Sequence, residues 1–134
     1  MVVATDKNNK VITLREYKHG SGKVQLTLPA GMLDHANEPL AKTARRELEE
    51  ETGFTGGTFK YLGCLYDYSS KDMHKVHIFR AKNVVRKLKQ KLEDTETIIQ
   101  VNLFSIQAIK KQIKSKEWDT THPISALALS GLLF

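Results

Sequence analysis

Short runs of apolar residues, separated by turn-forming stretches, predict several β-strands along the chain. The runs cover residues 11–14, 25–28, 59–62, 76–81 and 98–103. The run at 25–28 alternates polar and apolar residues, which is the period of a strand with one buried face. Residues 6–10 and 20–22 have the composition of turns and precede the first two runs. We therefore predict a sheet built from these strands.

The segment 38–52 carries the signals of an α-helix. Asn37 is a suitable N-cap residue, and Pro39 fits the first turn, where its missing amide proton leaves no hydrogen bond unmade. Gly53, directly after Thr52, is the residue type that ends many helices. Apolar residues at 40, 41, 44 and 48 form one stripe along this helix and predict the face that packs on the sheet.

Two further helices are predicted towards the end of the chain. In the first, at 106–116, Ser105 is a candidate N-cap and isoleucines recur at spacings of three and four. The second covers 124–133, with Thr121 as a candidate cap. The order of strands, helix, strands and helices predicts one α/β (or α+β) domain over residues 1–134, with helices packed on the sheet.

The composition is that of an ordinary globular domain, since 40% of the 134 residues are hydrophobic and 27% are charged. The single cysteine, Cys64, cannot form an internal disulfide, and neither a signal peptide nor a membrane-spanning stretch is visible. We expect a cytoplasmic protein with no membrane partner. The net charge of +6 favours polyanionic partners such as nucleotides or RNA, although a solvated basic surface explains it equally well.

Four glutamates fall close together near the end of the first predicted helix. At about 100° per residue, Glu47, Glu50 and Glu51 share an arc of about 100° beside the apolar stripe, whereas Glu49 points to the opposite side. Like charges at this spacing repel by about 0.2–0.5 kcal/mol per pair, and partial burial raises that cost. A divalent cation would remove the repulsion, and Mg²⁺ prefers such hard oxygen ligands. A solvated acidic helix face is the alternative for the segment 46–51 on its own.

The wider segment 28–54 resembles the Nudix box, whose pattern is G-x5-E-x7-R-E-U-x-E-E-x-G-U with U a bulky aliphatic residue. Seven residues separate Glu38 from Arg46, the stretch from Arg46 to Gly53 fits, and Phe54 replaces the usual aliphatic residue. Six residues instead of five separate Gly31 from Glu38. A similar spacing, in an L-P-A-G-x-L-D context, occurs in the family's ADP-ribose pyrophosphatase branch. The resemblance implies a mixed β-sheet sandwiched between helices.

The resemblance also implies roles for the residues of the box. The metal ligands, for Mg²⁺ with Mn²⁺ as an alternative, would be Glu47, Glu50, Glu51 and the backbone carbonyl of Ala30. Arg46 would hold these acids by charge-assisted hydrogen bonds and, with Glu47, belong to the catalytic residues. Glu38 would tie the loop to the helix, Gly31 would let the loop pass close to the metals, and Gly53 would complete the motif.

A general base is expected outside the box helix. Related pyrophosphatases often use a glutamate on a later loop to take the proton of the attacking water. In this chain the acidic segment 92–98 is the corresponding candidate, with Glu96 favoured over Glu93. An ordinary acidic surface loop is the alternative for both residues.

Four residues outside the box are candidates for substrate binding. Arg15 and Lys18, on a strand that resembles the same branch, could meet phosphate or ribose, and Tyr66 and Tyr68 could stack on a base. Surface cations and ordinary strand-end tyrosines are the alternatives. The chain lacks a proline that the branch often carries about sixteen residues beyond the box, and only 30 residues precede Gly31. Substrate choice and a homodimer are therefore left open.

His74 and His77 are the other chemically distinctive pair. On one strand, residues three apart face opposite sides and cannot readily chelate one ion. We interpret both histidines as polar strand positions.

The sequence thus predicts Mg²⁺-dependent hydrolysis of a small-molecule nucleoside diphosphate derivative. ADP-ribose or a nucleotide sugar is favoured, with a nucleoside monophosphate and a phosphorylated compound as products. One alternative is a hydrolase of nucleoside triphosphates or dinucleoside polyphosphates. Another is a non-catalytic module that binds RNA or protein through the basic segments 86–91 and 110–116.

Overall fold

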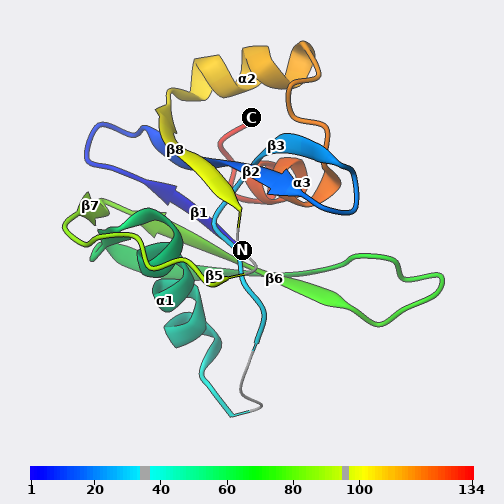
Figure 1. Ribbon diagram of the computed structural model, residues 1–134, viewed down its shortest axis with the longest axis horizontal. Coiled ribbons are helices and arrows are strands. Elements are labelled where there is room, and N and C mark those ends of the chain that lie inside the picture. Colours follow the sequence, from blue (N-terminus) through cyan, green and yellow to red (C-terminus); the bar gives the residue numbers. More distant parts are fainter. Residues whose placement is uncertain (34–36, 95–96) are drawn as a thin grey trace.

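The computed structural model describes residues 1–33, 37–94 and 97–134. The described residues form one six-stranded sheet and one two-stranded sheet (Figure 1). The larger sheet contains β1 (Val2–Thr5), β2 (Val11–Lys18), β3 (Lys23–Thr27), β5 (Thr58–Tyr66), β6 (Lys75–Lys82) and β8 (Ile98–Phe104). The smaller sheet pairs β4 (Phe54–Thr55) with β7 (Val85–Arg86).

The larger sheet is mixed, as the sequence predicts. Its strands follow the order β3-β2-β1-β6-β5, and β8 pairs with β2. β1 and β6 run parallel, with Val2 opposite Phe79, whereas the other pairs are antiparallel. Because β1 and β6 are parallel, both strands start at the same end of the sheet, and the candidate site lies at this end.

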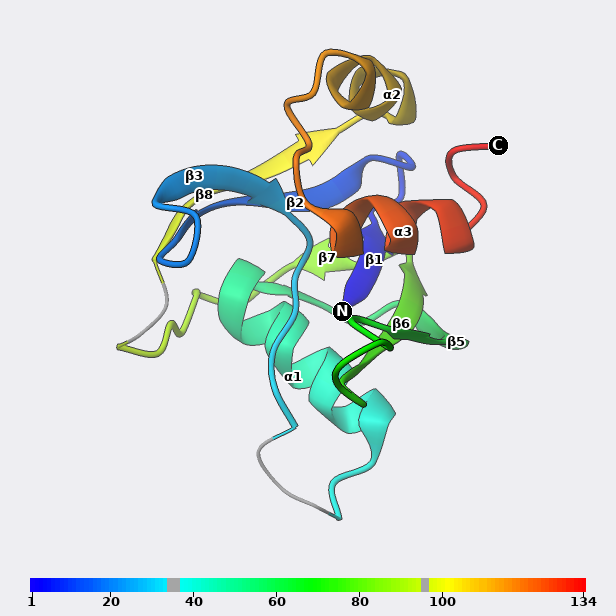
Figure 2. The same cartoon turned by 90° about the vertical axis from the view of Figure 1, so that its right-hand side faces the viewer.

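Helices cover both faces of the sheet (Figures 1 and 2). α1 (Leu40–Thr52) packs on one face, and α2 (Ile106–Lys114) and α3 (Thr121–Leu129) lie on the other. A hydrophobic core lies on each face of the sheet. Neighbouring residues of β1 belong to different cores, since Val2 packs with Leu48 of α1 and Val3 packs with Leu127 of α3. None of the helices in the described ranges is long and apolar enough to cross a bilayer.

The start of α1 differs from the prediction. The helix begins at Leu40, and Pro39 is its N-cap in an extended conformation. The carbonyl of Pro39 accepts hydrogen bonds from the amides of Lys42 and Thr43, at 2.9 and 3.2 Å. Asn37 is therefore wrong as the cap, because the residue before a proline disfavours helical geometry and the helix starts only after Pro39.

Other predicted elements are confirmed with shifted ends. All five predicted strands exist, and the Ser105 side chain accepts a hydrogen bond from the Ala108 amide at 3.2 Å as the cap of α2. α3 begins at Thr121 and ends at Leu129, earlier than predicted, and its N-cap is Thr120. β1 was not predicted, because this short strand is buried on both faces and lacks the alternation of a half-exposed strand.

Candidate active site

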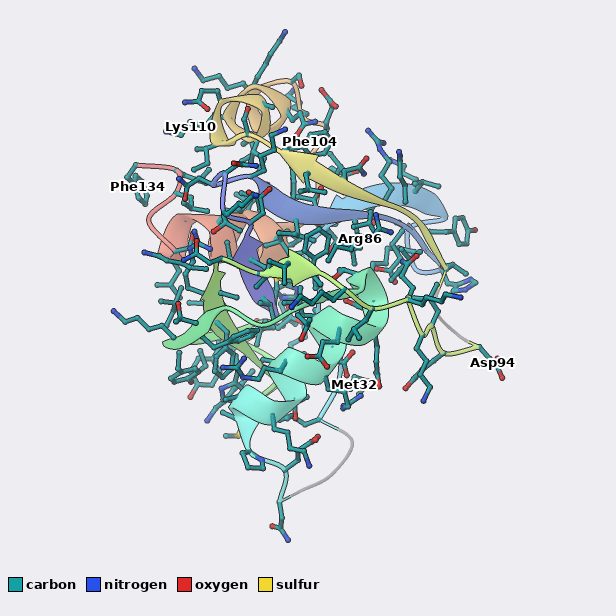
Figure 3. The ribbon with its side chains drawn as sticks, turned by 90° about the vertical axis from the view of Figure 1, so that its left-hand side faces the viewer. Met32, Arg86, Asp94, Phe104, Lys110 and Phe134 are labelled. Carbon is teal, nitrogen blue, oxygen red and sulfur yellow. The ribbon has the colours of Figure 1, made fainter. Side chains whose placement is uncertain are left out.

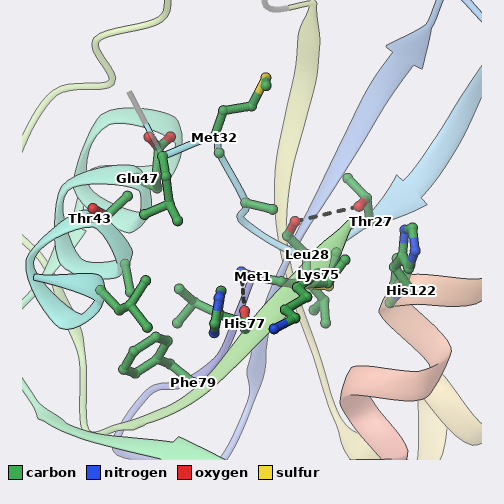
Figure 4. Close-up of a pocket in the computed structure, with 18 of the residues that line it drawn as sticks. Met1, Thr27, Leu28, Met32, Thr43, Glu47, Lys75, His77, Phe79 and His122 are labelled. Carbon is green, nitrogen blue, oxygen red and sulfur yellow. Dashed lines mark hydrogen bonds between the residues drawn. The ribbon is translucent and has the colours of Figure 1, made fainter. Parts of the chain in front are cut away.

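A cavity of about 600 Å³ opens between α1 and the start of α3 (Figure 4). Its floor is formed by the beginnings of β1 and β6 and by the end of β3. Ala30, Gly31 and Glu47 line one side, and His122 lines the other. The volume falls in the range of cavities that hold small organic ligands, about 300–1,000 Å³.

The acidic side of the cavity belongs to α1. Glu47 is 6% exposed and Glu51 is 3% exposed, so both carboxylates are buried next to the sheet. The amide of Ala30 donates a hydrogen bond to Oε2 of Glu51 at 2.9 Å. This bond places the backbone of the loop after β3 directly against the acidic face of the helix.

Arg46 lies among the carboxylates of the same helix. Its guanidinium lies 3.0 Å from Glu47, 3.1 Å from Glu50 and 3.8 Å from Glu38. Burial opposes the charged form, but the combined carboxylates outweigh it and raise the pKa of Arg46. Arg46 thus stays charged and offsets part of the repulsion among the acids.

Two residues of the preceding loop, Glu38 and Gly31, lie close to side chains of α1. Oε2 of Glu38 accepts a hydrogen bond from the Thr43 hydroxyl at 2.8 Å, which ties the loop to the first turns of the helix. A Cβ atom at Gly31 would collide with the carboxylate of Glu47. A side chain at position 31 would therefore displace the carboxylate that lines the cavity.

The end of α1 is held by a segment that we call the strap, residues 87–91. Its amides at Lys87 and Leu88 donate to the carbonyl of Gly53, at 3.1 and 3.0 Å. The Lys91 amide donates to the Glu50 carbonyl and the Gln90 side chain to the Glu51 carbonyl, both at 2.7 Å. The strap thereby satisfies carbonyls that a helix end leaves unpaired.

Gly53 is needed where the strap meets the helix. Its φ of 75° lies in the left-handed region, and a Cβ atom there would collide with the Leu88 carbonyl oxygen. The glycine of the motif therefore allows the strap, which leads into the acidic segment 92–98, to lie against the helix.

The carboxylates do not converge on one point in this structure. Glu47 and Glu50 face Arg46, while Glu51 faces the Ala30 amide. Within the ranges that the structure describes, no group of three or more His, Cys, Asp or Glu side chains is arranged to hold a metal ion. The predicted ligands are thus brought to neighbouring positions, and their joint role as ligands stays a prediction.

The two candidates for the general base are placed differently by the structure. Glu96 lies outside the described residues. Glu93 is described, is exposed, and does not belong to the residues that line the cavity. The assignment of the base to either residue stays a prediction.

Of the four predicted substrate-binding residues, Lys18 lines the cavity. Its Nζ atom lies 2.7 Å from the Glu16 carboxylate. Arg15 does not belong to the lining, and neither do Tyr66 and Tyr68, which are each 54% exposed.

The cavity lining also includes three histidines that sequence reasoning did not bring together. We call His74, His77 and His122 the histidine wall, since all three line the cavity. The interpretation of His74 and His77 as strand positions on opposite faces is wrong for His74. β6 begins only at Lys75, so the alternation of a strand does not apply to His74. No spacing in the sequence links these residues to His122.

His77 has a defined partner on the neighbouring strand. Its Nδ1 atom lies 3.0 Å from the hydroxyl of Tyr61 in β5. Burial lowers the pKa of His77, and nearby positive charges, including that of Lys75, lower it further. The ring is therefore neutral at pH 7, with one nitrogen as donor and the other as acceptor.

Two known proteins are similar to this chain in sequence. An ADP-ribose pyrophosphatase of Mycobacterium tuberculosis (strain ATCC 25618 / H37Rv) is 43% identical over 61 residues, which are 46% of this chain and 30% of that protein. An ADP-ribose pyrophosphatase of Bacillus subtilis (strain 168) is 29% identical over 117 residues, which are 87% of this chain and 62% of that protein. The chain thus spans less than two thirds of the length of both relatives.

The fold has a close structural counterpart as well. A crystal structure described as an ADP compounds hydrolase superposes with a TM-score of 0.84 at 23% identity, covering 98% of this chain and 69% of that one. The model of the NUDIX domain matches residues 1–124, which include the acidic helix, its loop and the sheet. The chain therefore belongs to the Nudix family.

Proposed function

We propose that the chain is a Mg²⁺-dependent pyrophosphohydrolase that cleaves the diphosphate of a nucleoside diphosphate derivative. The observation that carries this proposal is the pair of buried carboxylates, Glu47 and Glu51, next to a loop backbone and a cavity of about 600 Å³. Buried like charges are costly in a domain with no use for them. A cation-dependent reaction on a phosphate ester uses them directly.

The donor set fits a hard divalent cation. Glu47, Glu50 and Glu51 would hold it, together with the carbonyl of Ala30, whose amide already lies on Glu51. When bound, Mg²⁺ neutralises phosphate charge and lowers the pKa of a bound water. Manganese takes the same oxygen ligands and is a natural substitute.

The protein's own groups then orient the reaction. Arg46 holds Glu47 and Glu50 through contacts of 3.0 and 3.1 Å, and Glu38 fixes the loop through Thr43. We assign the general base to the segment 92–98, with Glu96 first and Glu93 second. The strap, which precedes this segment, is hydrogen-bonded to the end of α1, and this supports a base in the segment that follows it.

ADP-ribose or a nucleotide sugar is the proposed substrate, with a nucleoside monophosphate and a phosphorylated sugar as products. Two relatives that are ADP-ribose pyrophosphatases support this choice. The RNA-binding alternative has less support. Arg86 on β7 and Lys110 on α2 lie well apart in Figure 3, with β8 and β2 drawn between them, so the basic segments do not form one continuous face there.

The test is a substrate panel with Mg²⁺ that covers ADP-ribose, nucleotide sugars, nucleoside triphosphates and capped RNA. We expect turnover of ADP-ribose or a nucleotide sugar, and a loss of at least about 100-fold in the Glu51→Gln variant. Glu49→Gln is the matched control, because Glu49 bonds to Thr55 and lies off the acidic face. Unchanged Mg²⁺-dependent turnover in Glu51→Gln would show that the catalytic assignment is wrong. If nucleoside triphosphates are the only compounds hydrolysed, with release of pyrophosphate, the chain is a nucleoside triphosphate hydrolase instead.

A further inference from the structure

Two of the three histidines of the wall, His74 and His122, are held by one carboxylate, that of Asp67. Asp67 follows β5 and does not line the cavity itself. Its Oδ1 atom lies 2.7 Å from Nε2 of His122 on α3, and its Oδ2 atom lies 3.4 Å from Nδ1 of His74. Asp67 thus links the segment between β5 and β6 to the start of α3, and both of its imidazole partners line the cavity.

The cavity lining carries few lysines and arginines for a site that binds several phosphates. Among the described residues that line the cavity there are two lysines, Lys18 and Lys75, and no arginine. Lys18 is paired with Glu16 at 2.7 Å, and Nζ of Lys75 lies 5.4 Å from the ring centre of Tyr66. Sites for additional phosphates usually present arginine forks or clustered cations. A neutral part of the ligand suits this wall better.

The hydrogen-bonding capacity of the wall points to hydroxyl groups. A carboxylate only accepts, so His122 donates to Asp67 through Nε2, and its Nδ1 atom remains for another partner. His77 is bonded to Tyr61 through Nδ1, which leaves Nε2 for another partner. Figure 4 shows His122 on α3, on the side of the cavity away from Glu47, and His77 on β6, near Met1 and Phe79. Hydroxyl groups, which both donate and accept, match these free ring nitrogens.

We propose that the histidine wall is the subsite for the uncharged, hydroxyl-bearing sugar joined to the diphosphate, and that Asp67 is its positioning residue. This inference rests on the proposed function, because the acidic side of the same cavity would hold the diphosphate. The subsite distinguishes nucleotide sugars from nucleoside triphosphates, whose third phosphate would meet imidazoles in place of clustered cations.

The experiment compares two hydrolysis-resistant ligands that differ in the sugar, the α,β-methylene analogues of ADP-ribose and of ADP. Their Kd values are measured by isothermal titration calorimetry in Mg²⁺ for the wild type, His122→Ala, Asp67→Ala and Asp67→Asn. His19→Ala is the matched control, because His19 is an exposed histidine outside the cavity lining. Thermal unfolding of each variant verifies that it is folded.

We expect His122→Ala and Asp67→Ala to raise the Kd of the ADP-ribose analogue by about 3- to 10-fold, which is the effect of one lost hydrogen bond. Binding of the ADP analogue should stay within about twofold, since it has no group at this wall. Asp67→Asn should restore most of the loss, because its amide oxygen still accepts from His122. The control should match the wild type.

Equal weakening of both ligands, weakening of the ADP analogue alone, or no effect on either would each overturn the sugar subsite. Failure of the proposed function gives a different result. In that case the wild type binds neither analogue, or binds both and the panel shows no turnover. A selective effect of His122→Ala on the ADP-ribose analogue supports the subsite even without turnover.

Discussion

The two sides of the cavity are built in different ways. The acidic side comes from one helix and the loop before it, and Glu47, Glu50 and Glu51 are close in space because they are close in sequence. The histidine wall comes from the residues around β6 and from α3, and the pair that fixes it, Asp67 and His122, is 55 residues apart. The first depends on local helix geometry and the second on tertiary structure.

This difference separates the effects that substitutions should have. On the acidic side, a change in the helix, its loop or the strap moves several carboxylates together, because Arg46 links them. On the histidine wall, Asp67 contacts His74 and His122, whereas His77 has a separate partner, Tyr61. Substitutions there should have smaller and more separable consequences.

The largest effect is expected where the strap meets α1. Gly53→Ala places a Cβ atom against the Leu88 carbonyl in a left-handed conformation. We expect the free energy of unfolding to fall by about 3 kcal/mol, the upper end for a strained backbone position. Urea denaturation followed by circular dichroism measures it.

Gly56→Ala is the matched control for this substitution. Gly56 has a φ of 73°, but a Cβ atom there meets nothing within 4 Å. It should cost only the left-handed strain, about 1 kcal/mol. Equal losses in Gly53→Ala and Gly56→Ala would mean that the contact with Leu88 contributes nothing.

The same distinction explains how much could be predicted from the sequence. The helix that carries the acids, the glycine that ends it and the five strands were predictable, because each depends on residues a few positions apart. The pairing of Asp67 with His122 was not, because no local periodicity records which distant segments meet. The N-cap was misplaced for a local reason, since Asn37 and Pro39 both carry helix-start signals and Pro39 is the cap.

A smaller effect is expected at Gly31, in the loop on the acidic side. Gly31→Ala would push the Glu47 carboxylate away from the loop, which a flexible side chain allows at little cost in stability. If Glu47 is a metal ligand, as proposed, the Mg²⁺ concentration for half-maximal activity should rise by about 10-fold. Gly20→Ala, at a position with nothing within 4 Å of the added atom, is the control. An unchanged Mg²⁺ requirement in Gly31→Ala would remove Glu47 from the ligand set.

The smallest effect concerns His77 and tests the histidine wall through pH. Its pKa in the folded chain is lowered by burial and by nearby positive charges, including that of Lys75. The unfolded chain, with an ordinary histidine pKa of about 6.5, therefore takes up the proton first as the pH falls. The unfolded state binds more protons below about pH 6.5, so the native state loses stability there and keeps it above.

His77→Gln removes this proton uptake, so its free energy of unfolding should fall less than that of the wild type between pH 8 and pH 5.5. Lys75→Gln removes one of the causes and should give an intermediate dependence, because burial of the ring remains. Urea denaturation at both pH values measures the stability, and an NMR titration of the imidazole measures the pKa directly. A folded-state pKa at or above the ordinary value would contradict the neutral ring on which hydrogen bonding by His77 at this wall depends.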